Sequence, residues 1–252
     1  MLMKASGWNW PLFMAFIRWP LLMLAGAMVI LLYRWSGIEV GLYAGAVWAT
    51  LTVSLVNLIC LALLLWRGRV ERFRLRDLMG FRRGSLWRDL GAGLGISLLL
   101  FALMVGTVAA TFLLIQTVRG PLTFAQLYLG DADFSLALPW WLAAVSAIVF
   151  PVLNAPVEEL QYRGYAQPRL IARSGSVWLG IGLTAVAFGL QHTAFAFTLA
   201  AMPLFVVGFF VWGLGAGWIA HRQQRLAPLI IAHFISNLSF GVVPLIFALQ
   251  GG

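Results

Sequence analysis

The chain has 252 residues, of which 62% are hydrophobic and only 10% are charged, and its mean hydropathy is +0.93. A soluble domain carries about 25% charged residues, so this composition excludes an ordinary soluble protein. The net charge of +9 could suggest nucleic-acid binding. However, the basic residues lie between long apolar segments, where membrane topology explains them, and we expect no nucleic-acid partner. The single cysteine, Cys60, excludes a disulfide framework.

Apolar stretches long enough to cross a bilayer recur along the whole chain, since a spanning helix needs about 20 such residues. We therefore predict an all-α, polytopic transmembrane helix bundle of about seven to eight spanning helices. The spanning segments are expected at 10–33, 40–66, 90–117, 139–160, 176–195, 199–220 and 226–249. The stretch 121–138 is too interrupted to span, and a surface helix or a short re-entrant segment is expected there.

An arginine-rich connector, residues 67–88, lies between the second and third predicted spans and holds eight arginines. Placing it in the cytoplasm also places there Lys4, three arginines at 163–173 and two at 222–225, against two arginines outside. The positive-inside rule then predicts a cytoplasmic N terminus. The connector is expected to contact anionic lipid headgroups.

Polar side chains inside three of the predicted spans are conspicuous, because each is costly in a bilayer unless it is paired or hydrated. Glu158 and Glu159 lie near the end of the fourth span, His192 lies in the fifth, and His233 and Asn237 interrupt the seventh. Taken singly, a histidine or asparagine in a membrane often serves only packing or helix–helix hydrogen bonding. Together, these groups can be satisfied only if the three helices bring them to one site.

Helical spacing assigns partners to the two carboxylates. Glu159 and Arg163 are four residues apart with the acid first, the better orientation for an ion pair. Glu158 points about 100° away around the helix and has no basic partner at helical spacing, so it is the carboxylate expected to be free as a general base. His233 and Asn237 are also four residues apart and share one helix face.

The depth of the site follows from the helical rise. If the fourth helix continues past Arg163 to a turn at 173–175, an antiparallel hairpin brings Glu158 level with His192, and Pro168 could kink the helix there. His233 lies eight residues beyond Arg225. We therefore expect the pocket in the cytoplasmic half of the bilayer.

These residues resemble the motifs of the CAAX-protease and bacteriocin-processing family of intramembrane endopeptidases, which includes the type II CAAX prenyl endopeptidases. The family pattern is EExxxR, FxxxH and HxxxN or HxxxD on separate core helices. The chain has EELQYR at 158–163, FGLQH at 188–192 and HFISN at 233–237. The resemblance covers about 139–245.

The resemblance implies a catalytic helical core at 139–252, integrated into one membrane domain with the N-terminal helices of 1–138. It also implies peptide-bond hydrolysis without a covalent intermediate. Glu158 would activate a water that His192 positions, while His233 and Asn237 would stabilise the oxyanion. Three further motif residues would support the site or bind substrate: Glu159, Arg163 and Phe188.

Other interpretations stay open at the level of sequence. Glu158, His192 and His233 would also make a zinc site with an open position for water, although we favour no cofactor. A non-catalytic immunity or interaction protein of the same fold and a proton-coupled transporter are the alternatives to a protease. The expected substrate is a membrane-embedded or lipid-anchored peptide or protein, prenylated or not, at a bacterial inner membrane.

Overall fold

The computed structural model describes residues 9–132 and 138–250, so Lys4 lies outside the described residues. Helices make up nearly all of the described chain, which confirms the all-α prediction. In chain order they are α1 (Asn9–Phe16), α2 (Arg18–Trp35), α3 (Tyr43–Val47), α4 (Ala49–Glu71), α5 (Leu75–Met79), α6 (Leu86–Arg119), α7 (Phe124–Tyr128), α8 (Trp140–Glu159), the π-helix η2 (Leu160–Ala166), α9 (Gln167–Ser174), α10 (Val177–Gln191), the 3₁₀ turns η3 (His192–Phe195) and η4 (Leu199–Ala201), α11 (Met202–Gln223) and α12 (Ala227–Gln250).

Six helical segments of the described chain are long and apolar enough to cross a membrane. They are Asn9–Trp35, Ala49–Glu71, Leu86–Arg119, Trp140–Ser174, Val177–Phe195 and Leu199–Gln223. The seventh predicted span corresponds to α12, of which Ala227–Val242 forms a shorter apolar helix. The chain is therefore an integral, multi-pass membrane protein. In the interrupted stretch 121–138, the described residues form the five-residue α7, which is too short to span.

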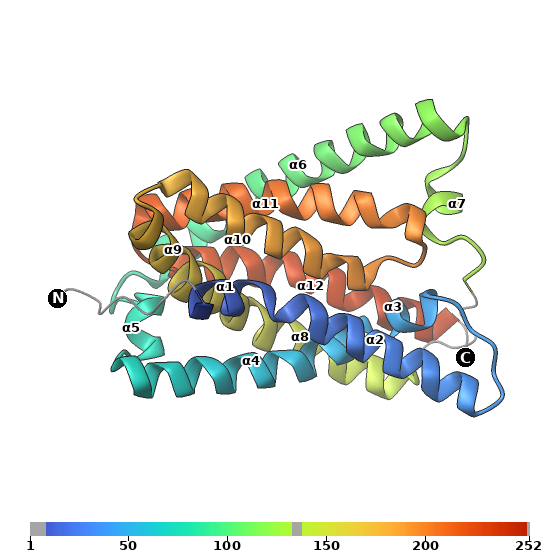
Figure 1. Cartoon of the computed structure of the whole chain (residues 1–252), viewed down its shortest axis with the longest axis horizontal. Coiled ribbons are helices and arrows are strands. Elements are labelled where there is room, and N and C mark those ends of the chain that lie inside the picture. Colours follow the sequence, from blue (N-terminus) through green and yellow to red (C-terminus); the bar gives the residue numbers. More distant parts are fainter. Residues whose placement is uncertain (1–8, 133–137, 251–252) are drawn as a thin grey trace.

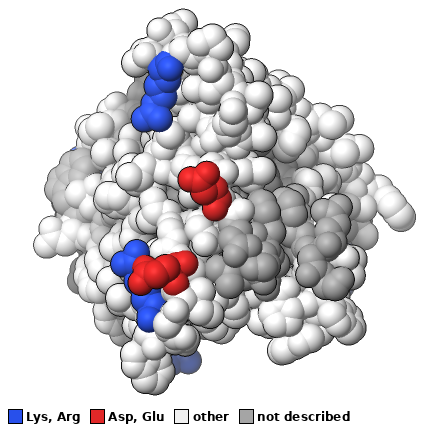
Figure 2. All heavy atoms as spheres, turned by 90° about the vertical axis from the view of Figure 1, so that its right-hand side faces the viewer, with Lys and Arg blue, Asp and Glu red and all other residues white. Residues whose placement is uncertain are grey.

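The two ends of the bundle differ in charge. One end carries α5, α9 and the start of the chain, and the other carries α3, α7 and the end of the chain (Figure 1). Ion pairs brace the first, arginine-rich end: Glu71 binds Arg67 and Arg169, and Asp89 binds Arg225. Figure 2 shows the second end, where charged side chains are sparse.

The helical fourth span continues past Arg163, as predicted from the level of Glu158 and His192. After α8, the chain continues through η2 and α9 to Gly175, whose φ of +67° ends the helix in the left-handed region that favours glycine. The Ser176 side chain then accepts a hydrogen bond from the Leu179 amide and starts α10. This hairpin brings the end of α8 level with the end of α10, where the Tyr162 hydroxyl donates to Gln191 at 3.1 Å.

A π-helical segment directly follows the two glutamates. In η2 the amide of Gln167 bonds to the carbonyl of Tyr162, five residues earlier. Pro168 lacks an N–H and cannot bond the carbonyl four residues before it, so an altered hydrogen-bond pattern ahead of Pro168 has a local cause. The expected irregularity therefore occupies Leu160–Ala166 rather than Pro168 itself. Such segments often occur at functional sites.

The helices enclose one large hydrophobic core that draws on both parts of the chain. Cys60 of α4, Leu100 of α6, Phe188 of α10 and Leu229 of α12 are all buried in it. Close approach of α10 to α11 depends on Gly189, since a Cβ there would lie 2.5 Å from the Val206 carbonyl oxygen. This packing holds the polar residues of α8, α10 and α12 in the interior.

Candidate active site

The structure brings the predicted site residues together inside the bundle. Glu158, His192, His233 and Asn237 are all buried, with 2% to 6% of each residue exposed, and Glu159 is fully buried. They come from α8, from η3 at the end of α10, and from α12. The convergence expected of polar groups on three separate spans is therefore present.

Glu159 is the anchor of a buried charged group. Arg163 Nη1 donates to Glu159 Oε1 at 3.1 Å, which confirms the predicted ion pair, and neither side chain is exposed. His233 Nδ1 donates to the same oxygen at 2.8 Å. The Arg163 guanidinium lies 4.4 Å from the ring centroid of Phe188, so the phenylalanine of the second motif supports the arginine of the first by a cation–π contact.

Glu158 does have a basic partner, contrary to the expectation from helical spacing. Arg18 of α2 donates from Nη2 to Glu158 Oε1 at 2.7 Å. Helical spacing identifies only partners on the same helix, whereas Arg18 is 140 residues away in the sequence. The second oxygen, Oε2, has no hydrogen-bond partner within the described residues, and it lies 3.6 Å from His233 Nε2.

Arg18 belongs to a polar network that motif reasoning missed. Its Nε donates to Gln191 at 2.6 Å, and its Nη1 donates to Asn57 at 2.8 Å. Nη2 also reaches Asn154 at 3.2 Å, and the Asn57 amide bonds to Asn154 at 2.9 Å. The sequence signal was present, because an arginine in the first span and an asparagine in the second are as costly in lipid as the motif residues.

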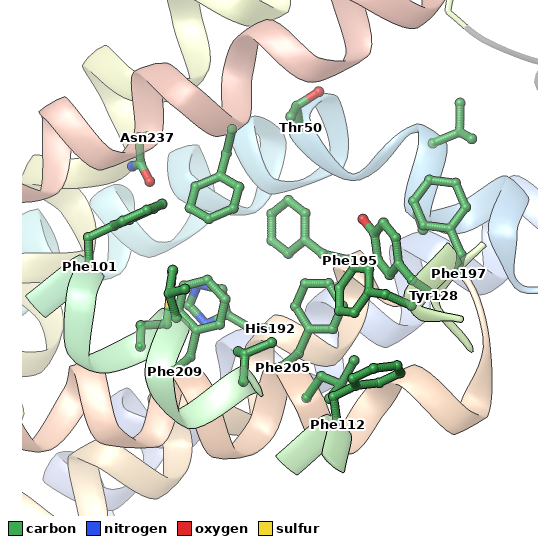
Figure 3. A pocket seen from close by; sticks show the side chains of 18 of the residues that line it. Thr50, Phe101, Phe112, Tyr128, His192, Phe195, Phe197, Phe205, Phe209 and Asn237 are labelled. Carbon is green, nitrogen blue, oxygen red and sulfur yellow. The ribbon is translucent and has the colours of Figure 1, made fainter. Parts of the chain in front are cut away.

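His192 and Asn237 face a cavity of about 590 Å³ (Figure 3). His192 Nδ1 donates to the carbonyl oxygen of Phe188 at 2.6 Å, so the other ring nitrogen is left for a ligand. The imidazole stacks on Phe209, with ring centroids 3.5 Å apart. Asn237 lines the cavity, and its side-chain nitrogen is a buried donor with no partner among the described residues.

Apolar and aromatic side chains form almost all of the remaining cavity wall. Nine phenylalanines line it: Phe101, Phe112, Phe124, Phe150, Phe195, Phe197, Phe205, Phe209 and Phe240. Figure 3 shows His192 and Asn237 toward one end of the cavity and Tyr128 toward the other. Burial raises the pKa of the Tyr128 hydroxyl to about 12, which keeps it neutral.

The cavity extends away from the arginine-rich end. Along α6, which starts at that end, its lining runs from Phe101 to Phe112, and it continues to Tyr128 of α7 at the charge-poor end. The polar cluster lies near the arginine-rich end, as expected from the short distance between Arg225 and His233. The cavity extends toward the charge-poor end, and the expected position of the pocket in the cytoplasmic half of the bilayer stays a prediction.

The two histidines are placed differently from the pairing that the motifs suggested. His233 lies with both glutamates, behind the cavity wall. His192 lies with Asn237 on the cavity surface. The imidazole nearer to the Glu158 carboxylate is therefore that of His233, and the motif residues that line the cavity are His192 and Asn237.

The residues of the hypothetical zinc site do not fit a metal. Within the described ranges, no group of three or more His, Cys, Asp or Glu side chains is arranged to hold one. One oxygen of Glu158 is held by the guanidinium of Arg18, a positive charge that would repel a cation at the same carboxylate.

The fold and the site together define a multi-pass, all-helical membrane protein with a carboxylate, two imidazoles and an amide grouped beside an apolar cavity. Residues 138–239 match the family described as type II CAAX prenyl endopeptidase Rce1-like. The match includes all three motifs and confirms the resemblance. At the level of the family, it supports an intramembrane endopeptidase of the CAAX type. Comparison with curated proteins and with solved structures gave no significant match.

Proposed function

We propose that the chain hydrolyses a peptide bond of a membrane-associated peptide or protein, with Glu158 as the general base. One observation carries the proposal: a buried carboxylate with one fixed and one unpartnered oxygen lies among imidazoles, next to a cavity that is lined by an asparagine with an unpartnered amide nitrogen. Hydrolysis without a covalent intermediate needs these parts, namely a base for water and a donor for the oxyanion.

In this mechanism, Glu158 Oε2 takes a proton from a water whose oxygen attacks the carbonyl carbon. The free ring nitrogen of His192 holds that water, and the Asn237 amide donates to the oxyanion. Collapse of the tetrahedral intermediate breaks the C–N bond, and the proton held by Glu158 passes to the leaving amine. His233 bonds Glu159 and faces Glu158, so we assign it the role of orienting the base.

The cavity supports a substrate with a bulky apolar group near the cleaved bond. Its wall presents aromatic rings with few polar atoms, a surface that suits long aliphatic or isoprenoid chains and large apolar side chains alike. A membrane-embedded peptide and a lipid-anchored peptide both meet this requirement. The proposed substrate class therefore includes prenylated and unprenylated chains.

We further propose that the arginine-rich end faces the cytoplasm of a bacterial cell. A surface hollow there is lined by Arg69, Arg74 and Arg76 together with Phe73, a combination that suits the phosphate and upper acyl chain of an anionic lipid. The apolar cavity then lies in the outer half of the bilayer. Single cysteines at positions 82 and 131, in a Cys60→Ala background, test this orientation: a membrane-impermeant maleimide should label only position 131 in intact spheroplasts, and labelling of position 82 alone would reverse it.

The decisive experiment is a search for cleavage with the purified chain in lipid nanodiscs. The probe is a peptide library made from the membrane proteins of a strain that lacks the chain, and new peptide termini are read by mass spectrometry. Wild type should produce termini with a consistent sequence pattern, and Glu158→Gln should not. Glu39→Gln is the matched control, because that carboxylate is 91% exposed. Equal cleavage by wild type and Glu158→Gln would contradict the proposal.

A further inference from the structure

We propose that Arg18 is a positioning residue that fixes the orientation of the Glu158 carboxylate, so that the active site includes a helix outside the family-matched segment. The inference rests on the proposed function, since it assigns Arg18 a task in the same reaction. The observation behind it is a fully buried guanidinium on α2, with each of its three nitrogens hydrogen-bonded to a different site-facing element.

The hydrogen bonds of Arg18 fix the orientation of its guanidinium plane. Nε is held by Gln191 at the end of α10, Nη1 by Asn57 of α4, and Nη2 by Asn154 and Glu158 of α8. Because the guanidinium is planar, fixing its three nitrogens fixes the direction of its N–H bonds. The N–H that reaches Glu158 therefore has a set direction.

That set direction determines which carboxylate oxygen stays available. Arg18 occupies Oε1 at 2.7 Å, while Oε2 remains unpartnered within the described residues and faces His233 Nε2 at 3.6 Å. A glutamate that was free to rotate would exchange its two oxygens and lose this alignment. Alignment of a base with its water is worth much in rate, because a misplacement of about 1 Å can cost about 100-fold.

A second ion pair, between Arg169 and Glu71, has a purely structural role and serves as a comparison for Arg18. Arg169 binds Glu71 at the arginine-rich end, and there the partially exposed Glu71 also accepts from Tyr165. Arg18 differs because its partner is the proposed base and because Gln191, which it also holds, immediately precedes His192. It thus touches both motif-bearing helix ends at once.

The test compares variants that keep or remove the charge. Arg18→Lys keeps one positive charge but loses the planar set of N–H donors. Asn57→Ala keeps the ion pair with Glu158 but removes one of the hydrogen bonds that orient the guanidinium plane. Arg18→Gln removes the charge. Arg34→Gln is the control, since Arg34 lies on the same helix in an exposed ion pair with Glu39. Each variant is assayed in nanodiscs with the best-cleaved library peptide for kcat and KM, and its thermal unfolding is measured.

We expect kcat to fall about 100-fold in Arg18→Gln and about tenfold in Arg18→Lys and Asn57→Ala, with KM within about threefold of wild type. Arg34→Gln should match wild type. Arg18→Lys and Asn57→Ala keep a positive charge beside the buried Glu158 carboxylate, so kcat and KM can be measured for them even if Arg18→Gln fails to fold. Wild-type kcat in both of these variants, or a raised KM with kcat unchanged, would overturn the inference.

A second measurement needs no catalysis. Hydrophobic carbodiimides modify protonated carboxyl groups in membranes, so a glutamate that Arg18 holds as a carboxylate should resist modification. Mass spectrometry should show Glu158 unmodified in wild type and Arg34→Gln, and modified in Arg18→Gln. Equal modification in all three would overturn the role of Arg18 while leaving the protease proposal standing. Absence of cleavage by wild type, with this modification pattern intact, would instead reject the proposed function alone.

Discussion

The family-matched segment, 138–239, and the N-terminal helices of 9–132 contribute different things to the same site. The matched segment holds Glu158, His192, His233 and Asn237 and is tightly packed, as at Gly189. The N-terminal helices form one side of the cavity wall through α3, α4, α6 and α7. Apart from Arg18 and its partner Asn57, they add no charged or amide group to the site within the described residues.

This division suggests that the chemistry resides in the matched segment, whereas both parts of the chain shape the cavity. A family can keep one catalytic arrangement while the wall of the cavity varies, because a wall residue alters which apolar group fits and not how the bond is broken. Substitutions of the polar site residues in the matched segment should therefore lower kcat, and substitutions on the cavity side of α6 should raise KM.

The largest effect is expected for Asn237→Ala. Removing one oxyanion donor typically costs about 10²–10³-fold in kcat, and KM should change little because the donor acts on charge that develops in the transition state. Ser239→Ala, two residues along the same helix at an exposed position, is the control. Kinetics with the reporter peptide give the answer, and a raised KM with unchanged kcat would move Asn237 from catalysis to substrate binding.

The next effect concerns packing. Gly189→Ala should destabilise the fold by about 1–3 kcal/mol, because overpacking forces neighbouring atoms apart and the new Cβ would lie 2.5 Å from the Val206 carbonyl oxygen. At Gly106 of α6 a Cβ would meet no described atom within 4 Å. Gly106→Ala should be neutral or stabilising by up to about 1 kcal/mol. Thermal unfolding in nanodiscs compares the two, and equal losses would remove the contrast in packing between the regions.

A smaller effect should follow from narrowing the cavity. Ala109 of α6 lines the cavity, whereas the adjacent Ala110 does not. Ala109→Trp should raise KM about tenfold for a substrate with a long apolar group, which corresponds to about 1.4 kcal/mol of lost binding, and should leave kcat nearly unchanged. Ala110→Trp should have neither effect. A fall in kcat alone for Ala109→Trp would show that α6 takes part in the chemistry.

No effect is expected from removal of metal. Among the described residues, no three His, Cys, Asp or Glu side chains are arranged to hold an ion, and the Arg18 guanidinium beside Glu158 would repel one. Activity measured after treatment with a chelator, followed by dialysis, should equal that of the untreated protein. Loss of activity that returns when zinc is added would reject the metal-independent mechanism and reinstate Glu158, His192 and His233 as ligands.

Much of this arrangement could be predicted from the sequence, and the reason lies in the solvent. In a bilayer a polar residue must find a partner, so the positions of Glu159, Arg163, His192 and His233 within apolar spans already indicate a single shared site. Spacing along a helix also gave the correct partner for Glu159. It could not give the partner of Glu158, since Arg18 meets it only through the packing of α2 against α4 and α10.

The cavity could not be predicted from the sequence, again because it depends on how the helices pack. Its wall is assembled from phenylalanines that are indistinguishable, by composition, from those that face lipid. Phe101 lines the cavity and is still 39% exposed, so neither hydropathy nor periodicity separates the two environments. Only the divergence of helices toward the charge-poor end determines which rings face the cavity.

The π-helical segment Leu160–Ala166 gives the chain one place between the first two motifs where its length can change. Hydrogen bonds between residues five apart accommodate one extra residue in a single wide turn. Deleting one residue at 164–166 would therefore restore ordinary α-helical bonding and leave α9 and α10 close to their present orientation. A deletion within α8 has no such turn to absorb it, and it would rotate the residues on its two sides by about 100° relative to each other. A single-codon deletion should therefore be tolerated better in the π-helical segment than in α8.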